Sequence, residues 1–192
     1  MSATAETVLA GGFADIPIDA AHGFRAAMTA MARPGRVTTV AGAAPPAPVS
    51  PAAGVLILTL CDAETPLFLA PSHDTAAMRN WLAFHTGVPL VAPEAADFAL
   101  GAWADLPLSR MKLGRAEYPD RSCTVIVEMP ELVADTHRLV GPGIETEAFL
   151  RLPETGVFQA NRRQFPLGLD FFFTAGNQLA ALPRTTRIEE VA

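Results

Sequence analysis

Lysine is almost missing from this sequence of 192 residues, in which Lys112 is the only one. A pyridoxal-phosphate enzyme needs a lysine to form its Schiff base. The residues around Lys112 show no feature of such a site, so we do not expect that chemistry. Arginine therefore carries almost all of the positive charge, a bias that a genome of high GC content explains by default.

Cysteine and histidine are too sparse and too scattered to predict a metal centre. The spacing of Cys61 and Cys123 fits no zinc pattern, and both lie among apolar residues. We expect them to be small core residues in a reducing compartment. The histidines contain no pair at positions i and i+4, as a helix-borne metal site would need. The sequence therefore predicts neither a metal nor a cofactor.

Positive charge and long apolar runs are also lacking. The net charge is −6, whereas a nucleic-acid binder usually has a basic excess. No segment approaches the roughly 20 apolar residues of a membrane-spanning helix. The N-terminal segment does not have the basic and apolar regions of a signal peptide. We expect a cytoplasmic protein that binds neither nucleic acid nor membranes.

Hydrophobic residues, by contrast, make up 50% of the chain, a composition typical of a folded protein. The length suits one domain with a sizeable core and is short for two. Residues 1–15 are small and weakly patterned, which predicts a loose N-terminal arm. Residues 16–192 are then expected to form the single domain.

Helical patterns recur along this domain. One helix is predicted after a capping Asp19 and ends at Arg33-Pro34-Gly35. A second is predicted from Asp74 to His85, capped by Ser72 or Asp74 and closed by Gly87. A short third helix is expected over residues 155–164.

Strand patterns lie between these helices. Residues 122–129 show the clearest alternation, and residues 137–140 are expected to pair with them. The apolar run 54–60 is a buried helix or a strand, and residues 43–53 are interpreted as a loop. Further strands are predicted over residues 36–40, 67–69, 97–102, 169–174 and 178–182. The simplest outcome is an α/β domain with a mixed sheet flanked by helices.

Few residues suggest a specific chemistry. Asp62 and Glu64 could act as an acid–base pair, but a polar turn is the better explanation. His85 ends an apolar helix, where capping or packing is more common than ligand binding. Gly141-Pro142-Gly143 is too short for a phosphate-binding loop and indicates a plain turn.

Arginines form three islands, at residues 33–36, 162–163 and 184–187. The planar guanidinium group donates two parallel hydrogen bonds, which suits phosphate and carboxylate. The islands could converge on an anion. They could equally form surface ion pairs, which contribute little stability each. Residue chemistry alone slightly favours the second interpretation.

Several segments, taken in order, resemble the PhnH family of phosphonate-metabolism proteins. They span residues 13–188 and include FRAAM (24–28), MARPGR (31–36), LTLCDAETP (58–66), WLAFHTG (81–87), GRAEYPDRS (114–122), LVGPGI (139–144), NR with FP (161–166), GLD (168–170) and LPRTT (182–186). The resemblance covers nearly the whole chain.

The resemblance implies a subunit of the carbon–phosphorus lyase core complex, with PhnG, PhnI, PhnJ and PhnK as companions. PhnH is needed with PhnG, PhnI and PhnL for the step that joins phosphonate to the ribose C1 of a purine nucleotide and displaces the base. The implied fold is like the large domain of pyridoxal-phosphate-dependent transferases without the cofactor. Homodimers and no independent activity are also implied.

No catalytic residue is carried over by the resemblance. Within the matching segments, our candidates for an anion pocket or a subunit contact are Arg33, Asp62, His85, Arg121, Arg162 and Arg184. Three roles remain open, in order of preference. The chain is a scaffold subunit, a subunit that binds a phosphonate or nucleotide through arginines, or a free-standing enzyme.

Overall fold

The computed structural model describes residues 10–190 of the chain. Most of the arm predicted for residues 1–15 therefore lies outside the described residues. The described part of that arm contacts the body of the protein. The Ala44 amide donates to the Gly11 carbonyl oxygen at 2.9 Å, and Phe13 packs against the core.

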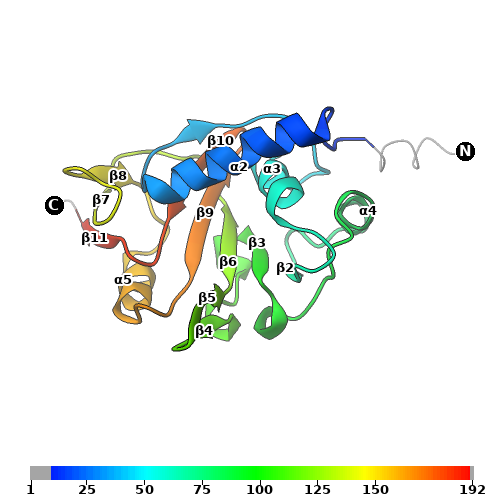
Figure 1. Cartoon of the computed structure of the whole chain (residues 1–192). Helices are drawn as coiled ribbons and strands as arrows, with labels where there is room; N and C mark the ends of the chain where they lie inside the picture. The colour runs from blue at the N-terminus through cyan, green and yellow to red at the C-terminus, as the bar shows by residue number, and fades with distance from the viewer. Residues whose placement is uncertain (1–9, 191–192) are drawn as a thin grey trace, which may run out of the picture.

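A six-stranded mixed sheet forms the centre of the fold (Figure 1), in the order β1-β10-β9-β6-β3-β2. Strands β2, β3, β6 and β9 are parallel, and β10 pairs antiparallel with both β9 and β1. The strands are β1 (Thr38–Thr39), β2 (Leu67–Leu69), β3 (Phe98–Ala102), β6 (Thr124–Glu128), β9 (Asp170–Ala175) and β10 (Gln178–Leu182). This confirms the predicted α/β class with a mixed sheet. The likeness to pyridoxal-phosphate-dependent transferases stays a prediction.

Three helices cover one face of the sheet: α2 (Ile16–Ala32), α3 (Pro51–Leu60) and α4 (Ala76–His85). The buried side of α2 consists of Gly23, Ala27 and Ala30, small residues that let it approach α3 closely. A Cβ atom at Gly23 would lie only 2.3 Å from the Thr59 hydroxyl oxygen. The glycine is therefore a requirement of helix packing.

The apolar run 54–60, left open by its periodicity, is the body of helix α3. Ser50 caps the helix by accepting a hydrogen bond from the Ala53 amide at 3.2 Å, and Pro51 begins it. Residues 51–53 were predicted to be loop, and that prediction is wrong. The helix is apolar on all sides because it is buried between α2 and the sheet, which removes the helical periodicity.

The other face of the sheet carries helix α5 (Thr155–Arg163) and a small antiparallel sheet in the order β11-β7-β8. The strands of that sheet are β7 (His137–Val140), β8 (Ala148–Leu150) and β11 (Arg187–Glu190). Residues 137–140 were expected to pair with β6, and this prediction is wrong. Strand β6 is paired with β3 and β9 along both edges, so it has no free edge to offer.

Two of the three predicted helix starts are displaced, whereas α5 begins at Thr155 as predicted. Helix α2 begins at Ile16 with Asp15 as its cap, whose carboxylate accepts from the Ile18 amide at 3.3 Å. Asp19 was predicted as the cap, but it lies in the first turn and accepts from the Asp15 amide at 3.0 Å. Helix α4 is capped by Thr75, because Arg79 binds the Asp74 carboxylate and the Ser72 hydroxyl contacts His73.

Both cysteines are free and buried, as predicted. Burial raises the pKa of each thiol to about 12, so both stay protonated and unreactive at neutral pH. Within residues 10–190, no helix has the length and apolar character needed to cross a membrane.

Candidate functional site

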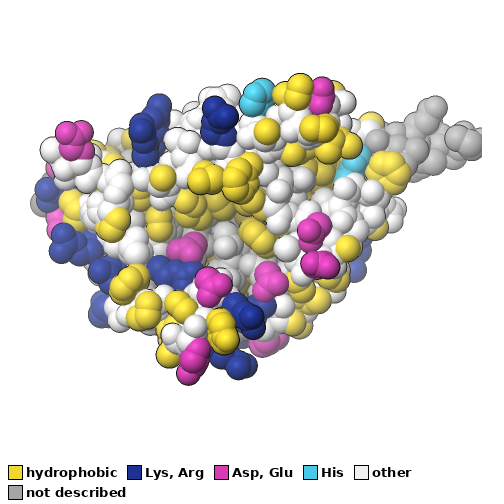
Figure 2. Space-filling view, viewed as in Figure 1, with side chains coloured by type: hydrophobic (Ala, Val, Ile, Leu, Met, Phe, Trp, Pro, Cys, Tyr) yellow, Lys and Arg dark blue, Asp and Glu magenta, His cyan; other side chains and the backbone are white. Residues whose placement is uncertain are grey.

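A groove lies at the amino ends of neighbouring parallel strands. Phe98, Thr124 and Asp170 begin β3, β6 and β9 and stand level with one another in the sheet. Phe98 and Thr124 line a polar groove of about 790 Å³ and also an apolar recess of about 360 Å³. We call the first the hairpin groove. Figure 2 shows the hollow below helix α2, with acidic and basic side chains around it.

A β-hairpin, β4 (Leu113–Arg115) with β5 (Tyr118–Ser122), builds the outer wall of the groove. It is a separate two-stranded sheet that projects from the main sheet. Gly114 has φ of +84°, and a Cβ atom there would lie 2.7 Å from the Pro119 carbonyl oxygen. Only glycine fits this crossing of the two strands.

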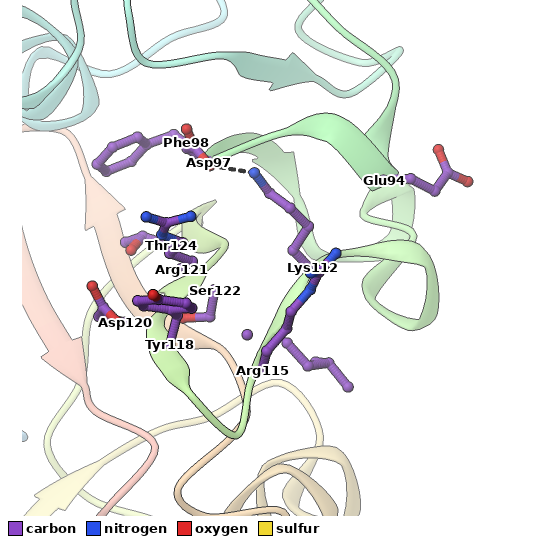
Figure 3. Close-up of a pocket in the computed structure, with 12 residues that line it drawn as sticks. Glu94, Asp97, Phe98, Lys112, Arg115, Tyr118, Asp120, Arg121, Ser122 and Thr124 are labelled. Atoms are coloured by element: carbon purple, nitrogen blue, oxygen red, sulfur yellow. Dashed lines mark hydrogen bonds and ion pairs between the residues drawn. The ribbon is translucent and has the colours of Figure 1, made fainter.

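The hairpin and the residue before it place three cationic side chains on the groove: Lys112, Arg115 and Arg121 (Figure 3). Lys112 is paired with Asp97. The Arg121 guanidinium lies over the ring of Tyr118, with its central carbon 4.4 Å from the ring centroid. Such stacking orients the guanidinium plane and leaves its edge free to donate hydrogen bonds.

The groove is not simply basic, because Glu94, Asp97 and Asp120 also line it. Glu94 is paired with Arg110, at 2.7 Å between Oε1 and Nε. Within residues 10–190, neither Arg115 nor Arg121 takes part in an ion pair. These two arginines are therefore the side chains best placed to receive an anion.

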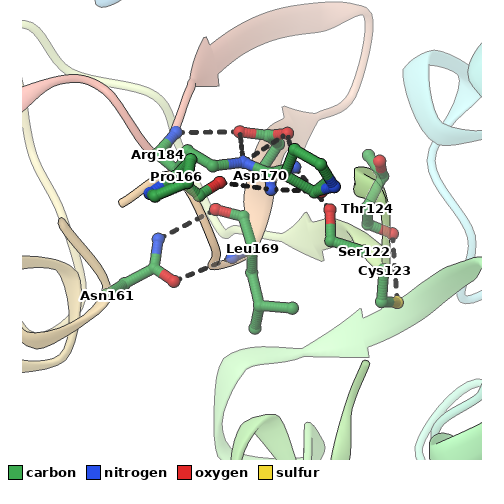
Figure 4. Close-up of polar contacts among 9 residues, drawn as sticks. Ser122, Cys123, Thr124, Asn161, Pro166, Leu169, Asp170 and Arg184 are labelled. Atoms are coloured by element: carbon green, nitrogen blue, oxygen red, sulfur yellow. Dashed lines mark hydrogen bonds and ion pairs between the residues drawn. The ribbon is translucent and has the colours of Figure 1, made fainter. Parts of the chain in front are cut away.

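Arg184 holds the base of this hairpin from inside the protein (Figure 4). Its Nε donates to both Asp170 carboxylate oxygens at 3.2 Å, and its Nη2 donates to one of them at 2.5 Å. Nη1 donates to the carbonyl oxygens of Pro119 at 2.8 Å and Pro166 at 3.3 Å, and Nη2 also reaches the Ser122 hydroxyl. All five N–H donors of the guanidinium thus have partners within the chain.

The arrangement gives Arg184 a structural role. Its side chain is 11% exposed, and that of Asp170 is 24% exposed. The pair ties the start of β9 to the hairpin and to the turn after α5. An anion in the groove would have to displace one of these partners to bind Arg184 directly.

Arg162 stands in the last turn of helix α5. Its guanidinium carbon is 5.2 Å from the centroid of the Phe165 ring. Its Nε is buried and has no hydrogen-bond partner in the part of the chain that the structure describes. Neighbouring Asn161 binds the backbone of Leu169 through two hydrogen bonds of 2.8 Å, which fixes the turn that leads into β9.

The other three candidates from the sequence lie apart from the groove. Asp62 forms a polar turn after α3, in which its carboxylate accepts from the Glu64 amide at 2.9 Å and contacts the Thr65 hydroxyl. His85 packs against Trp81 and Phe84 on helix α4. Arg33 is the exposed C-cap of α2. Arg33 is not among the residues that line the hairpin groove, and convergence of the three arginine islands on one anion stays a prediction.

Sequence reasoning missed most of the groove. Lys112 was considered only as a Schiff-base lysine, and Arg115, Tyr118 and Asp97 were not singled out. The sequence does contain a pattern that points to this groove, because three cationic residues and the only tyrosine lie within residues 112–121, around a turn. That pattern did not show that the turn folds back against the amino ends of β3 and β6.

Comparison with known proteins gives this site a family context. A family profile described as bacterial phosphonate metabolism protein (PhnH) matches residues 11–189. The chain belongs to the PhnH family. The resemblance seen in the sequence is thereby confirmed, and with it the link to phosphonate metabolism.

Two curated relatives align over most of the chain. One, from Rhizobium meliloti (strain 1021), is named alpha-D-ribose 1-methylphosphonate 5-triphosphate synthase subunit PhnH. It is 39% identical over 95% of this chain and 96% of its own length. The other is HtxG of Stutzerimonas stutzeri, provisionally named a C–P lyase subunit protein. It is 32% identical over 86% of this chain and 83% of its own length.

Proposed function

We propose that this chain is a non-autonomous subunit of a carbon–phosphorus lyase complex in alkylphosphonate catabolism. It serves the step that joins phosphonate to the ribose C1 of a purine nucleotide with loss of the base. The observation that carries this proposal is the end-to-end alignment with the Rhizobium meliloti synthase subunit. The companions are those implied by the family, PhnG, PhnI, PhnJ and PhnK, and a homodimer and a cytoplasmic location belong to the same proposal.

The surface of helix α2 supports a scaffold role. Ile16, Ile18, Phe24 and Met28 are large apolar residues with 51–69% of their surface exposed. Figure 2 shows a row of hydrophobic side chains along this helix, above the hollow. Large apolar residues exposed in a row are typical of a surface that another protein covers. Phe24 and Met28 stand one turn apart on the same side of α2. We call this pair the α2 face and propose that a companion subunit binds it.

Co-expression tests the proposal directly. The tagged chain would be produced with PhnG, PhnI and PhnJ from the same source, and the purified material sized by light scattering. We expect a complex of fixed stoichiometry that survives gel filtration. A chain that purifies alone under these conditions would contradict the subunit assignment.

A second role, ligand binding, is favoured by one observation: Arg115 and Arg121 flank the hairpin groove without internal ion pairs in residues 10–190. In this alternative the subunit holds the phosphate groups of a nucleotide, or a phosphonate. Stacking on Tyr118 presents the Arg121 fork to such an anion. The balanced charge of the groove limits affinity, because Asp120 opposes the same ligand.

Titration with inorganic pyrophosphate separates this role from the scaffold role. We expect calorimetry to detect binding that weakens about tenfold or more in Arg121→Ala and in Arg115→Ala, since each charged hydrogen bond contributes roughly 1.5–3 kcal/mol. Arg25→Ala is the matched control, because Arg25 is exposed on α2 and does not line the groove. Equal pyrophosphate binding by all three variants would show that the hairpin groove is not the anion site.

A further inference from the structure

Two exposed aromatic residues, each followed by a proline, come from neighbouring backbone segments. Tyr118 lies in the hairpin, and Phe165 lies in the turn after α5. A single nitrogen, Nη1 of Arg184, donates to the carbonyl oxygens of Pro119 at 2.8 Å and Pro166 at 3.3 Å (Figure 4). The two segments are therefore held side by side, although they are far apart in the sequence. Each ring residue keeps 51% of its surface exposed.

Each ring is stacked by an arginine from its own segment. The central guanidinium carbon of Arg121 lies 4.4 Å from the centroid of the Tyr118 ring (Figure 3). The corresponding carbon of Arg162 lies 5.2 Å from the centroid of the Phe165 ring. Stacking occupies one face of a guanidinium group and leaves the N–H groups at its edge available as donors. We call these four residues the double-stack face.

The charge of the double-stack face is opposite to that of the whole chain. Segments 118–121 and 162–165 together carry three arginines and one carboxylate, whereas the net charge of the chain is −6. Within residues 10–190, neither Arg121 nor Arg162 takes part in an ion pair. A local excess of unpaired positive charge attracts a negatively charged partner.

The composition of the face favours a protein segment over a small anion. Arg162 and Phe165 do not line the hairpin groove, so the face extends beyond the groove onto the turn after α5. A small anion bound to one arginine would leave both rings in water, whereas a peptide covers them with apolar side chains. Aromatic residues and arginine are enriched where proteins bind one another. Nucleic acid also stacks on aromatic rings, but the net charge of the chain disfavours it.

We propose that the double-stack face binds an acidic segment of another protein, in which carboxylates flank an apolar side chain. The carboxylates accept hydrogen bonds from Arg121 and Arg162, and the apolar side chain covers the rings. Arg184 is a positioning residue, because it fixes the spacing of the two segments. This interaction goes beyond the proposed function, since neither the α2 face nor the hairpin groove requires Phe165.

A short peptide of two leucines flanked on both sides by glutamates is the probe, and two-dimensional NMR of the free protein is the readout. We expect saturable shifts of the amide signals of residues 118–121 and 162–168, while those of α2 stay unchanged. The same peptide with glutamines in place of the glutamates should bind at least about tenfold more weakly, because it carries no charge. Added salt should also weaken binding of the glutamate peptide.

Variants assign the peptide to the double-stack face. Arg121→Ala and Arg162→Ala should each weaken binding about tenfold, the effect of losing a hydrogen bond between charged groups. Arg25→Ala removes an exposed arginine on α2 and should bind the peptide as the unaltered protein does. Phe165→Ala should weaken binding, whereas Phe84→Ala, at a similarly exposed position on α4, should not. The spectrum of each free variant shows whether it is folded.

Pyrophosphate binding separates the double-stack face from the hairpin groove. Arg162→Ala should leave pyrophosphate binding unchanged, whereas Arg121→Ala should weaken the binding of both pyrophosphate and the peptide. These measurements use the free chain, so they are independent of the subunit assignment.

Three results would overturn the inference: shifts that do not saturate, equal binding of the glutamine peptide, or equal peptide binding by Arg162→Ala and Arg25→Ala. Tighter binding of a single-stranded oligothymidylate than of the glutamate peptide would overturn it in favour of nucleic acid.

Discussion

Arg184→Ala should cost about 3 kcal/mol of folding stability and lower the melting temperature by about 6–12 °C. The reason is the Asp170 carboxylate, which is bound by three hydrogen bonds from the guanidinium and is 24% exposed. Removing the arginine leaves this charge largely buried without its counter-ion. Thermal unfolding followed by circular dichroism measures the effect.

The same substitution should loosen the hairpin more than the main sheet. Arg184 donates to the Pro119 carbonyl oxygen and to the Ser122 hydroxyl, both in β5. Hydrogen exchange in the hairpin amides is therefore expected to accelerate, while that of β6 changes little.

Two further variants serve as comparisons for the stability loss expected in Arg184→Ala. Arg184→Lys keeps the charge but lacks the planar fork, so we expect a smaller loss of stability than with alanine. Arg163→Ala removes an exposed arginine at the end of α5 and should shift the melting temperature by less than about 2 °C. If Arg184→Ala had the same melting temperature as the unaltered protein, the pair with Asp170 would not stabilise the fold. Arg184 would then not be held in a structural role and could bind a ligand.

The double variant Phe24→Asp with Met28→Asp should reduce the affinity for the companion subunits about a hundredfold or more. Burying side chains of this size contributes roughly 1.5–3 kcal/mol each, and the introduced carboxylates would have to be desolvated at the interface. Both positions are exposed, at 51% and 57%, so the free chain should fold normally. Co-purification with PhnG, PhnI and PhnJ, quantified against the unaltered chain, measures the loss.

Phe84→Asp is the matched control, because Phe84 is an equally exposed aromatic residue on helix α4. Retention of the complex in Phe84→Asp and its loss in the double variant would assign the contact to the α2 face. Equal capture by both variants would contradict that assignment. Light scattering compares the molar mass of the purified double variant with that of the unaltered chain. A lower mass for the variant would show that the α2 face serves self-association instead.

Local patterns were sufficient for most helices and strands. The alternation of residues 122–129 predicts that Val125 and Val127 point to one side of the sheet and Ile126 to the other, as observed. The turn at residues 175–177 joins β9 to β10 as a hairpin. These features depend on neighbours in the sequence, which is why a single sequence reveals them.

The candidate site was predicted only in part. Arg121 lies on the hairpin groove, and Arg184 lies behind it with every donor engaged. Arginine chemistry indicated Arg184 as a residue that binds oxygen acceptors. It could not distinguish an acceptor in a ligand from one in the chain itself, because Asp170 and Pro119 become neighbours of Arg184 only on folding.

By itself, the sequence determined the α/β class, the two inert core cysteines and membership of the PhnH family, since these follow from composition, local periodicity and ordered motifs. The tertiary structure alone decided that residues 54–60 are a helix, that residues 137–140 belong to a second sheet, and that a hairpin builds the groove. Each of these depends on which surfaces are buried against distant segments. The Ser50 amide, for example, is held at 2.7 Å by Glu128, 78 positions away. Such pairings arise from burial and strand edges, which local sequence does not encode.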